Sequence, residues 1–149
     1  MSENQPKKVL VIDDEQAIVD ELVSFLFQHG YMPTVCMNAD DALVSAQSEV
    51  FDLIISDINL GMVSGLELCQ RIHELENANE TPVIFLSGAQ IPDIIRRSRS
   101  AGGTYYVRKP FDPEVMVELM DKAMWFPVLT HSHIRRTSEQ FEMAMAEMS

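Results

Sequence analysis

The chain has 149 residues, 46% of them hydrophobic, and a formal net charge of −12 at pH 7. This size and composition suit one folded domain, and the strong negative charge argues against direct binding of nucleic acid, which needs clustered lysine and arginine. No apolar run reaches the roughly 20 residues of a membrane helix, and residues 1–8 lack a signal-peptide core, so we expect a cytoplasmic protein without membrane contact.

Short apolar runs alternate with stretches that carry apolar residues at helical spacing, which predicts alternating strands and helices. The expected strands occupy residues 9–12, 31–36, 53–56, 81–86 and 105–107. The expected helices occupy residues 18–29, 39–48, 65–74, 93–101 and 113–125, the fourth starting at Pro92 or Asp93. Asn38 and Asp112 are favoured helix caps, Pro113 suits a first helical position, and Gly30 suits a helix end.

Five strand–helix units in succession predict an α/β fold, a doubly wound five-stranded parallel sheet with helices on both faces. The run 53–55 shows no polar alternation, as expected for a strand that is buried on both sides. Residues 1–125 form the predicted domain. Residues 126–149 form a C-terminal tail that is too short for an independent domain and is either an amphipathic helix or a frayed extension.

Polar side chains follow four of the expected strands at the point where each strand ends. Asp13 and Asp14 follow the first strand, Asp57 the third, Ser87 the fourth and Lys109 the fifth. Because the carboxyl ends of parallel strands meet at one edge, we expect these side chains to converge there. Three crowded carboxylates repel one another unless a cation compensates, and magnesium, a hard cation that prefers oxygen ligands, would do so.

This set of residues suits phosphoryl transfer. A carboxylate such as Asp57 can attack phosphorus and form an acyl phosphate. Magnesium would bridge Asp57 and a phosphoryl oxygen, Lys109 would bind a second oxygen, and the Ser87 hydroxyl or a nearby backbone N–H would bind a third. Each residue alone could be an ordinary cap or turn residue, so it is the joint placement at strand ends that favours a site.

Together these motifs resemble the receiver domain of two-component response regulators, over about residues 7–125. They are Asp13-Asp14, Asp57 after an apolar strand, Gly65 eight residues later, Ser87-Gly88 and Lys109-Pro110-Phe111. The resemblance implies a flavodoxin-like sheet with strand order 2-1-3-4-5, as in chemotaxis regulators. It also implies a phosphorylation-activated signalling switch.

The resemblance further implies roles for single residues. Asp57 would be the phosphoacceptor, and Asp14 and Asp57 would be direct ligands of Mg²⁺. Asp13 would act on the metal through water, and Asn59 would contribute its backbone carbonyl. The peptide bond between Lys109 and the proline after it would be cis.

A switch is implied by the same resemblance. Ser87 would move toward the phosphoryl group, and Tyr106, three residues before Lys109, would turn inward as Ser87 moves. An ordinary strand aromatic is the alternative interpretation of Tyr106, since Tyr105 stands beside it.

The helix expected after the first strand carries a second apolar face, formed by Val19, Val23 and Phe27. Such a helix is either deeply buried or docks a partner. The resemblance implies that this region receives the phosphodonor, a sensor histidine kinase or a histidine phosphotransfer protein. We expect Ala17, Val19 and Val23 to help form that docking surface.

The output is expected to be a protein–protein contact. A downstream target would bind either the face made by the fourth helix, fifth strand and fifth helix, or the tail, which could also pair two chains as a homodimer. Arg96, Arg97 and Arg99 make the fourth helix basic. This stripe is either a solvated face or a contact for an acidic partner.

Two other classes compete with a receiver. A magnesium-dependent phosphohydrolase with an aspartyl-phosphate intermediate usually carries a second aspartate where Asn59 stands, so we expect no enzyme beyond self-catalysed phosphotransfer and autodephosphorylation. A flavin or nucleotide binder would place a phosphate after the first strand, where Asp13, Asp14 and Glu15 would repel it. Within the receiver interpretation, an output regulator, a relay intermediate and a phosphate sink all stay open.

Overall fold

The main sheet has five parallel strands in the order β2-β1-β3-β6-β7. These strands are β1 (Lys8–Ile12), β2 (Met32–Cys36), β3 (Leu53–Asp57), β6 (Val83–Ser87) and β7 (Tyr105–Arg108). Numbered within this sheet alone, they follow the order 2-1-3-4-5. The predicted doubly wound, flavodoxin-like sheet is therefore confirmed.

The structure is a computed structural model that describes residues 5–88 and 93–125. The predictions for residues 126–149, and the suggested helix start at Pro92, lie outside these described residues. None of the helices in the two described segments combines the length and the apolar character that a membrane crossing requires.

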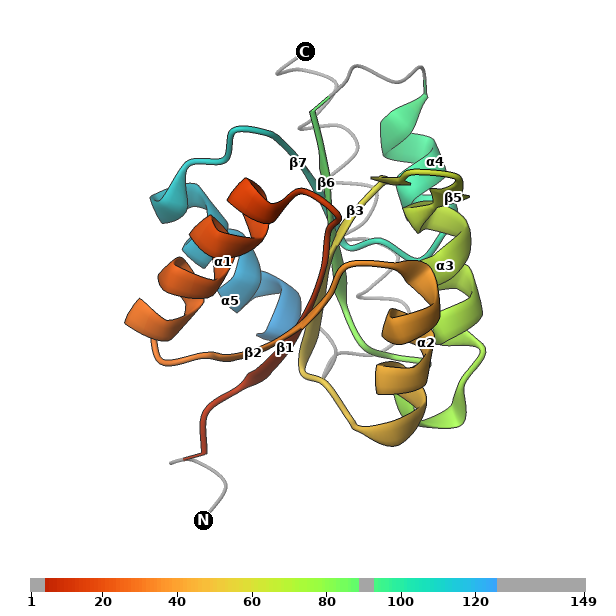
Figure 1. Cartoon of the computed structure of the whole chain (residues 1–149), viewed down its shortest axis with the longest axis horizontal. Coiled ribbons are helices and arrows are strands. Elements are labelled where there is room, and N and C mark those ends of the chain that lie inside the picture. Colours follow the sequence, from red (N-terminus) through yellow and green to blue (C-terminus); the bar gives the residue numbers. More distant parts are fainter. Residues whose placement is uncertain (1–4, 89–92, 126–149) are drawn as a thin grey trace.

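Helices cover both faces of the sheet, as Figure 1 shows. On one face lie α1 (Gln16–Gln28) and α5 (Pro113–Trp125). On the other face lie α2 (Ala39–Ser48), α3 (Gly65–His73) and α4 (Ile94–Ser100), with the short 3-10 helix η2 (Glu76–Ala78) after α3. This arrangement leaves the carboxyl ends of the strands open along one edge.

The alternation of side chains along β1 divides the core into two apolar clusters. Val9 and Val11 pack with residues of α1 and α5, whereas Leu10 and Ile12 pack with residues of α2 and α3. All residues of β3 are buried, as its unbroken apolar run predicts. Burial on both faces holds the central strands, and so the residues at their ends, in fixed positions.

Residues at the helix ends act as the sequence predicts. The Asn38 side chain accepts a hydrogen bond from the Asp41 N–H at 2.8 Å and caps α2. The Asp112 carboxylate accepts one from the Glu114 N–H at 2.9 Å at the start of α5. The residue before α4 is Asp93, whose φ of 57° lies in the left-handed region, so this helix begins only at the following residue.

A second, two-stranded antiparallel sheet was not predicted. It pairs β4 (Asn59–Leu60) with β5 (Val63–Ser64) directly after β3. Gly61, with a φ of 74°, forms the turn, because glycine adopts positive φ without steric cost. Met62 beside it is fully exposed. The hairpin places a short wall next to the end of β3.

Candidate functional site

The polar residues at the strand ends meet at one edge of the sheet. Asp13 follows β1, Asp57 ends β3, Ser87 ends β6 and Lys109 follows β7. The backbone N–H of Lys109 donates to the carbonyl oxygen of Ser87 at 2.8 Å, which fixes these two strand ends side by side. Doubly wound sheets bind their ligands beyond this edge.

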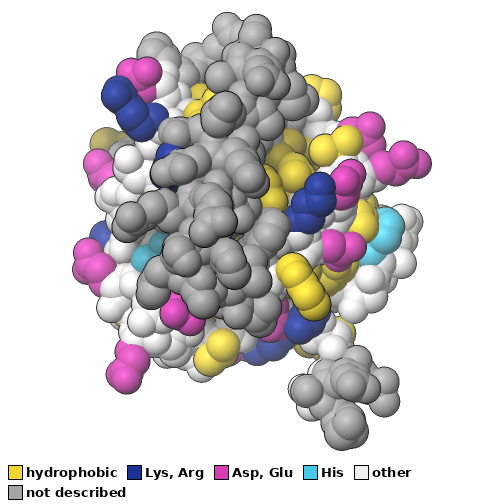
Figure 2. Space-filling model, turned by 180° about the vertical axis from the view of Figure 1, so that it is seen from behind, with side chains coloured by type: hydrophobic (Ala, Val, Ile, Leu, Met, Phe, Trp, Pro, Cys, Tyr) yellow, Lys and Arg dark blue, Asp and Glu magenta, His cyan; other side chains and the backbone are white. Residues whose placement is uncertain are grey.

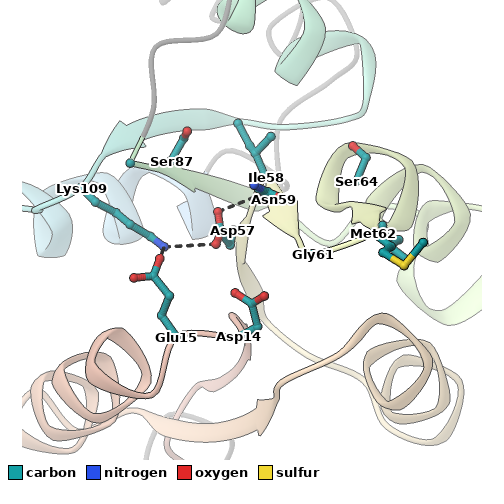
Figure 3. A pocket seen from close by; sticks show the side chains of 12 residues that line it. Asp14, Glu15, Asp57, Ile58, Asn59, Gly61, Met62, Ser64, Ser87 and Lys109 are labelled. Atoms are coloured by element: carbon teal, nitrogen blue, oxygen red, sulfur yellow. Dashed lines mark hydrogen bonds and ion pairs between the residues drawn. The ribbon is translucent and has the colours of Figure 1, made fainter.

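These residues surround an open cleft with a volume of about 620 Å³, shown in Figure 3. Its lining includes Asp14, Asp57, Asn59, Ser87 and Lys109. Carboxylate oxygens of Asp13, Asp14 and Asp57 lie within 4.8 Å of one another. Clustered carboxylate oxygens are the ligands that a small hard cation prefers, so these residues fit a magnesium ion.

The ammonium group of Lys109 lies among three carboxylates. Its Nζ atom is 3.1 Å from Asp57 Oδ2, 2.9 Å from Asp13 Oδ2 and 2.8 Å from Glu15 Oε1. Burial lowers the pKa of Lys109, but the hydrogen bonds and charges of these carboxylates outweigh burial and hold the pKa above its usual range. The ammonium therefore stays charged at neutral pH.

The carboxylate of Asp13 is fully buried. The pKa of Asp13 lies above its ordinary value, mainly because burial disfavours the charged form. The Glu15 N–H and the Lys109 ammonium lower this pKa, whereas the nearby charge of Asp57 raises it. The Glu15 N–H donates to Asp13 Oδ1 at 2.9 Å. A buried anion of this kind keeps its charge only beside a cation, and Lys109 supplies one.

Each oxygen of the Asp57 carboxylate has a donor. The Asn59 N–H donates to Oδ1 at 3.1 Å, and Lys109 Nζ donates to Oδ2 at 3.1 Å. Asp57 is 5% exposed and lines the cleft. The carboxylate is thus held in one orientation at the cleft.

Gly65 fixes the backbone below the cleft. Its N–H donates to the Ile58 carbonyl at 2.6 Å, so the first turn of α3 lies directly against the residues after β3. A Cβ atom at this position would lie 1.9 Å from the Asp57 carbonyl oxygen and 3.0 Å from its carbonyl carbon. Backbone atoms cannot yield as a flexible side chain can, so this position requires glycine.

Replacing Gly65 by alanine is therefore expected to lower the free energy of unfolding by about 2 kcal/mol, because the backbone of β3 or α3 must shift. Urea denaturation followed by circular dichroism measures this change. Gly88→Ala is the matched control, since among the described residues its Cβ would meet only the Lys109 side chain, at 3.9 Å. Equal stability of the two variants would contradict the close approach.

Of the residues of the predicted switch, Ser87 ends β6 and Tyr106 is the second residue of β7. Ser87 is buried and lines the cleft. Tyr106 is 5% exposed and lies inward, in the same apolar cluster as Phe85 and Ala101. Tyr105 packs in the cluster on the other side of the sheet. The Lys109–Pro110 peptide bond is cis, as the resemblance implies.

The predicted docking surface needs one correction. Val19 is only 4% exposed, so it packs inside the domain and offers almost no surface to a partner. Ala17 is exposed and Val23 is half-buried, whereas Phe27 is 63% exposed. The buried face of α1 thus includes Val19 in addition to the apolar residues at helical spacing, which are Ile18, Leu22, Phe25 and Leu26.

The basic stripe on α4 is partly paired within the chain. Arg96 Nη2 lies 3.0 Å from Asp93 Oδ2, with both side chains largely exposed, and Arg97 is exposed. Figure 2 shows acidic, basic and apolar side chains interspersed on the described part of the face behind the view of Figure 1. An exposed pair of this kind adds little stability.

Several residues that line the cleft were not predicted as part of the site, Glu15 and Met62 among them. Glu15 reaches Lys109 across 94 positions of the sequence, and Met62 stands fully exposed at the cleft wall. The position of Glu15 directly after Asp13-Asp14 was the available signal. No signal pointed to Met62, because its exposure depends on a hairpin of only two short strands.

Comparison with known proteins gives the same family from sequence and from structure. Residues 9–121 match the family model described as the response regulator receiver domain. The chain is 32% identical to the Bacillus subtilis transcriptional regulatory protein YvrH over 90% of this chain and 52% of that protein. It is 36% identical to the Escherichia coli transcriptional regulatory protein CreB over 73% of this chain and 47% of that protein.

The chain thus spans about half the length of these two relatives. Among solved structures, the chemotaxis protein CheY4 of Vibrio cholerae matches with a TM-score of 0.75 and 28% identity, over 79% of this chain and 98% of that chain. The family match, the strand order and the acidic cleft agree. The chain therefore belongs to the response regulator receiver domains, the phosphorylation-activated switches of two-component signalling.

Proposed function

We propose that Asp57 accepts the phosphoryl group from a phosphohistidine on a sensor kinase or a histidine phosphotransfer protein. The observation that carries this proposal is the position of the Asp57 carboxylate. It lines an open cleft, lies within reach of two further carboxylates, and is held by the Lys109 ammonium at 3.1 Å. The buried ammonium distinguishes this cluster from an ordinary group of surface acids.

The covalent step follows from this geometry. An oxygen of Asp57 attacks the phosphorus atom, the bond between phosphorus and the donor imidazole nitrogen breaks, and that nitrogen takes up a proton from solvent. The Asn59 N–H and Lys109 hold the two carboxylate oxygens in place before attack. Lys109 then offers positive charge to the oxygens of the transferred group.

The chain also offers a set of ligands for Mg²⁺. Asp14 and Asp57 line the cleft and would hold the ion directly, together with the backbone carbonyl of Asn59. Asp13 is buried and engaged by Lys109, so it would act through water. When bound, the ion supplies positive charge that offsets both the crowded carboxylates and the phosphoryl oxygens.

The signal would leave the site through β6 and β7. Ser87 lies at the cleft, and Tyr106 lies in the apolar cluster on the α4 side of the sheet. A shift of Ser87 toward the phosphoryl group would change the packing around Tyr106 and so the face made by α4, β7 and α5, where a downstream protein or a second copy of the chain would bind. The phosphodonor would dock near Ala17 and Val23 on α1.

Incubation with phosphoramidate, a small phosphodonor, tests the proposal without a protein partner. With magnesium present, intact-mass analysis is expected to show one phosphoryl adduct per chain, and EDTA is expected to prevent it. Phosphate release is followed in parallel. An adduct that forms equally well in EDTA, or the release of many phosphates per chain each minute, would contradict the receiver function and favour a different chemistry.

A further inference from the structure

The Glu15 carboxylate contacts Lys109 although phosphoryl transfer as described assigns it no task. We propose that Glu15 is a placeholder for the phosphoryl group: it pairs with Lys109 in the unphosphorylated protein, and an oxygen of the arriving group displaces it. This inference rests on the proposed function of Asp57 and Lys109. It means that Glu15 lowers the affinity of the site for the phosphoryl group.

The ammonium of Lys109 is already surrounded by carboxylates. An ammonium group carries three N–H donors and no acceptor. Nζ donates hydrogen bonds to Glu15 Oε1 at 2.8 Å and Asp57 Oδ2 at 3.1 Å, and Asp13 Oδ2 lies 2.9 Å away as an ion-pair partner. The Lys109 side chain is 8% exposed, so little room is left for a further partner. A phosphoryl oxygen can therefore bind this ammonium closely only if one carboxylate withdraws.

The exposure of the three partners indicates which one withdraws. The Asp13 side chain is 0% exposed and would lose its charge partner inside the protein. The Asp57 side chain is 6% exposed and is itself the proposed acceptor. The Glu15 side chain is 59% exposed, so water can solvate its carboxylate as soon as it leaves Lys109. Of the three carboxylates, Glu15 therefore loses the least free energy when it separates from Lys109, because it does not remain as a buried charge without a partner.

The position of Glu15 also places it in the path of the ligand. It lines the same cleft as Asp57, and in Figure 3 its carboxylate lies just below the end of the Lys109 side chain. A phosphoryl group next to Asp57 and Lys109 brings negative charge close to this carboxylate. When Glu15 leaves, the phosphoryl group gains a closer contact with the Lys109 ammonium and is no longer repelled by the Glu15 carboxylate.

Beryllofluoride tests the inference, because it resembles a phosphoryl group in charge and tetrahedral shape. It binds without a phosphodonor and without phosphoryl transfer. Its affinity is measured by amide NMR titration at saturating magnesium. Glu15→Gln is expected to bind it roughly three- to tenfold more tightly than the wild type, since a neutral amide competes less for the ammonium. The phosphoramidate reaction is expected to accelerate by a similar factor.

Two matched variants separate direct contact from net charge. Glu76→Gln makes the same change in net charge on η2, after the far end of α3, and is expected to bind beryllofluoride like the wild type. Glu15→Asp keeps the charge but withdraws the carboxylate by one methylene group, so it is expected to resemble Glu15→Gln. Unchanged affinity in Glu15→Gln, an equal gain in Glu76→Gln, or wild-type affinity in Glu15→Asp would each overturn the inference.

The same titration distinguishes this inference from the function on which it rests. A wild-type protein that binds beryllofluoride and forms the phosphoryl adduct, together with an unaltered Glu15→Gln variant, refutes only the role of Glu15. A wild-type protein that neither binds beryllofluoride nor forms an adduct refutes the proposed function and the inference with it.

Discussion

Replacing Asp57 by asparagine is expected to abolish the phosphoryl adduct that phosphoramidate forms on this chain. The amide has nearly the shape of the carboxylate and can still accept the hydrogen bond that the Asn59 N–H donates at 3.1 Å. It is not a nucleophile toward phosphorus, so the fold and the cleft are retained while the covalent step is lost. Intact-mass analysis after incubation with magnesium measures the result.

The other end of the same strand provides the control. Asp52 directly precedes β3, and its Oδ2 accepts a hydrogen bond from the Lys8 N–H at 2.8 Å, at the edge of the sheet opposite the cleft. Asp52→Asn is expected to form the adduct to the wild-type extent. An adduct of undiminished yield in Asp57→Asn would place the phosphoryl group on another residue.

Lys109→Met is expected to impair both stability and phosphorylation. Methionine fills a similar volume but leaves the buried Asp13 and Asp57 carboxylates facing each other without a cation. Loss of one partner from such a buried set costs about 3 kcal/mol of the free energy of unfolding, measured by urea denaturation without magnesium. The rate of adduct formation is expected to fall by about a hundredfold, because no ammonium then stabilises the phosphoryl oxygens.

An exposed lysine shows how much of this effect depends on burial. Lys122 is 53% exposed and pairs with Glu118 one turn away at 3.1 Å. Lys122→Met is expected to change stability by less than about 0.5 kcal/mol and to leave phosphorylation unaltered. If Lys109→Met were as stable as Lys122→Met, the carboxylates of the cleft would not depend on the ammonium.

The sheet and the cleft could be predicted because they follow from simple regularities. The apolar run of β3 predicts burial on both sides, which is typical of a central strand in a parallel sheet. Once the strands are parallel, Asp57 and Lys109 must meet at one edge, although 52 positions separate them. Topology rather than local preference brings these side chains together.

The features that could not be predicted depend on neighbours that spacing alone does not specify. The sequence places Val19 on a second apolar face of α1, yet Val19 is buried. How many residues of this helix are covered depends on the sheet against which it packs. The β4–β5 hairpin consists of two-residue strands, too short to leave a periodic pattern. The contact of Glu15 depends on the reach and rotamer of a long side chain.

The assembly of the cleft from several strand ends has a consequence for folding. Asp13 and Lys109 come from opposite ends of the described chain, and every neighbouring pair in the main sheet requires a crossover connection. Such long-range closure makes sheet formation cooperative, and no fragment holds the acceptor, the ammonium and the other carboxylates together. A partly folded chain therefore presents no site for phosphorylation, so the modified fraction of the protein reports only molecules that have folded completely.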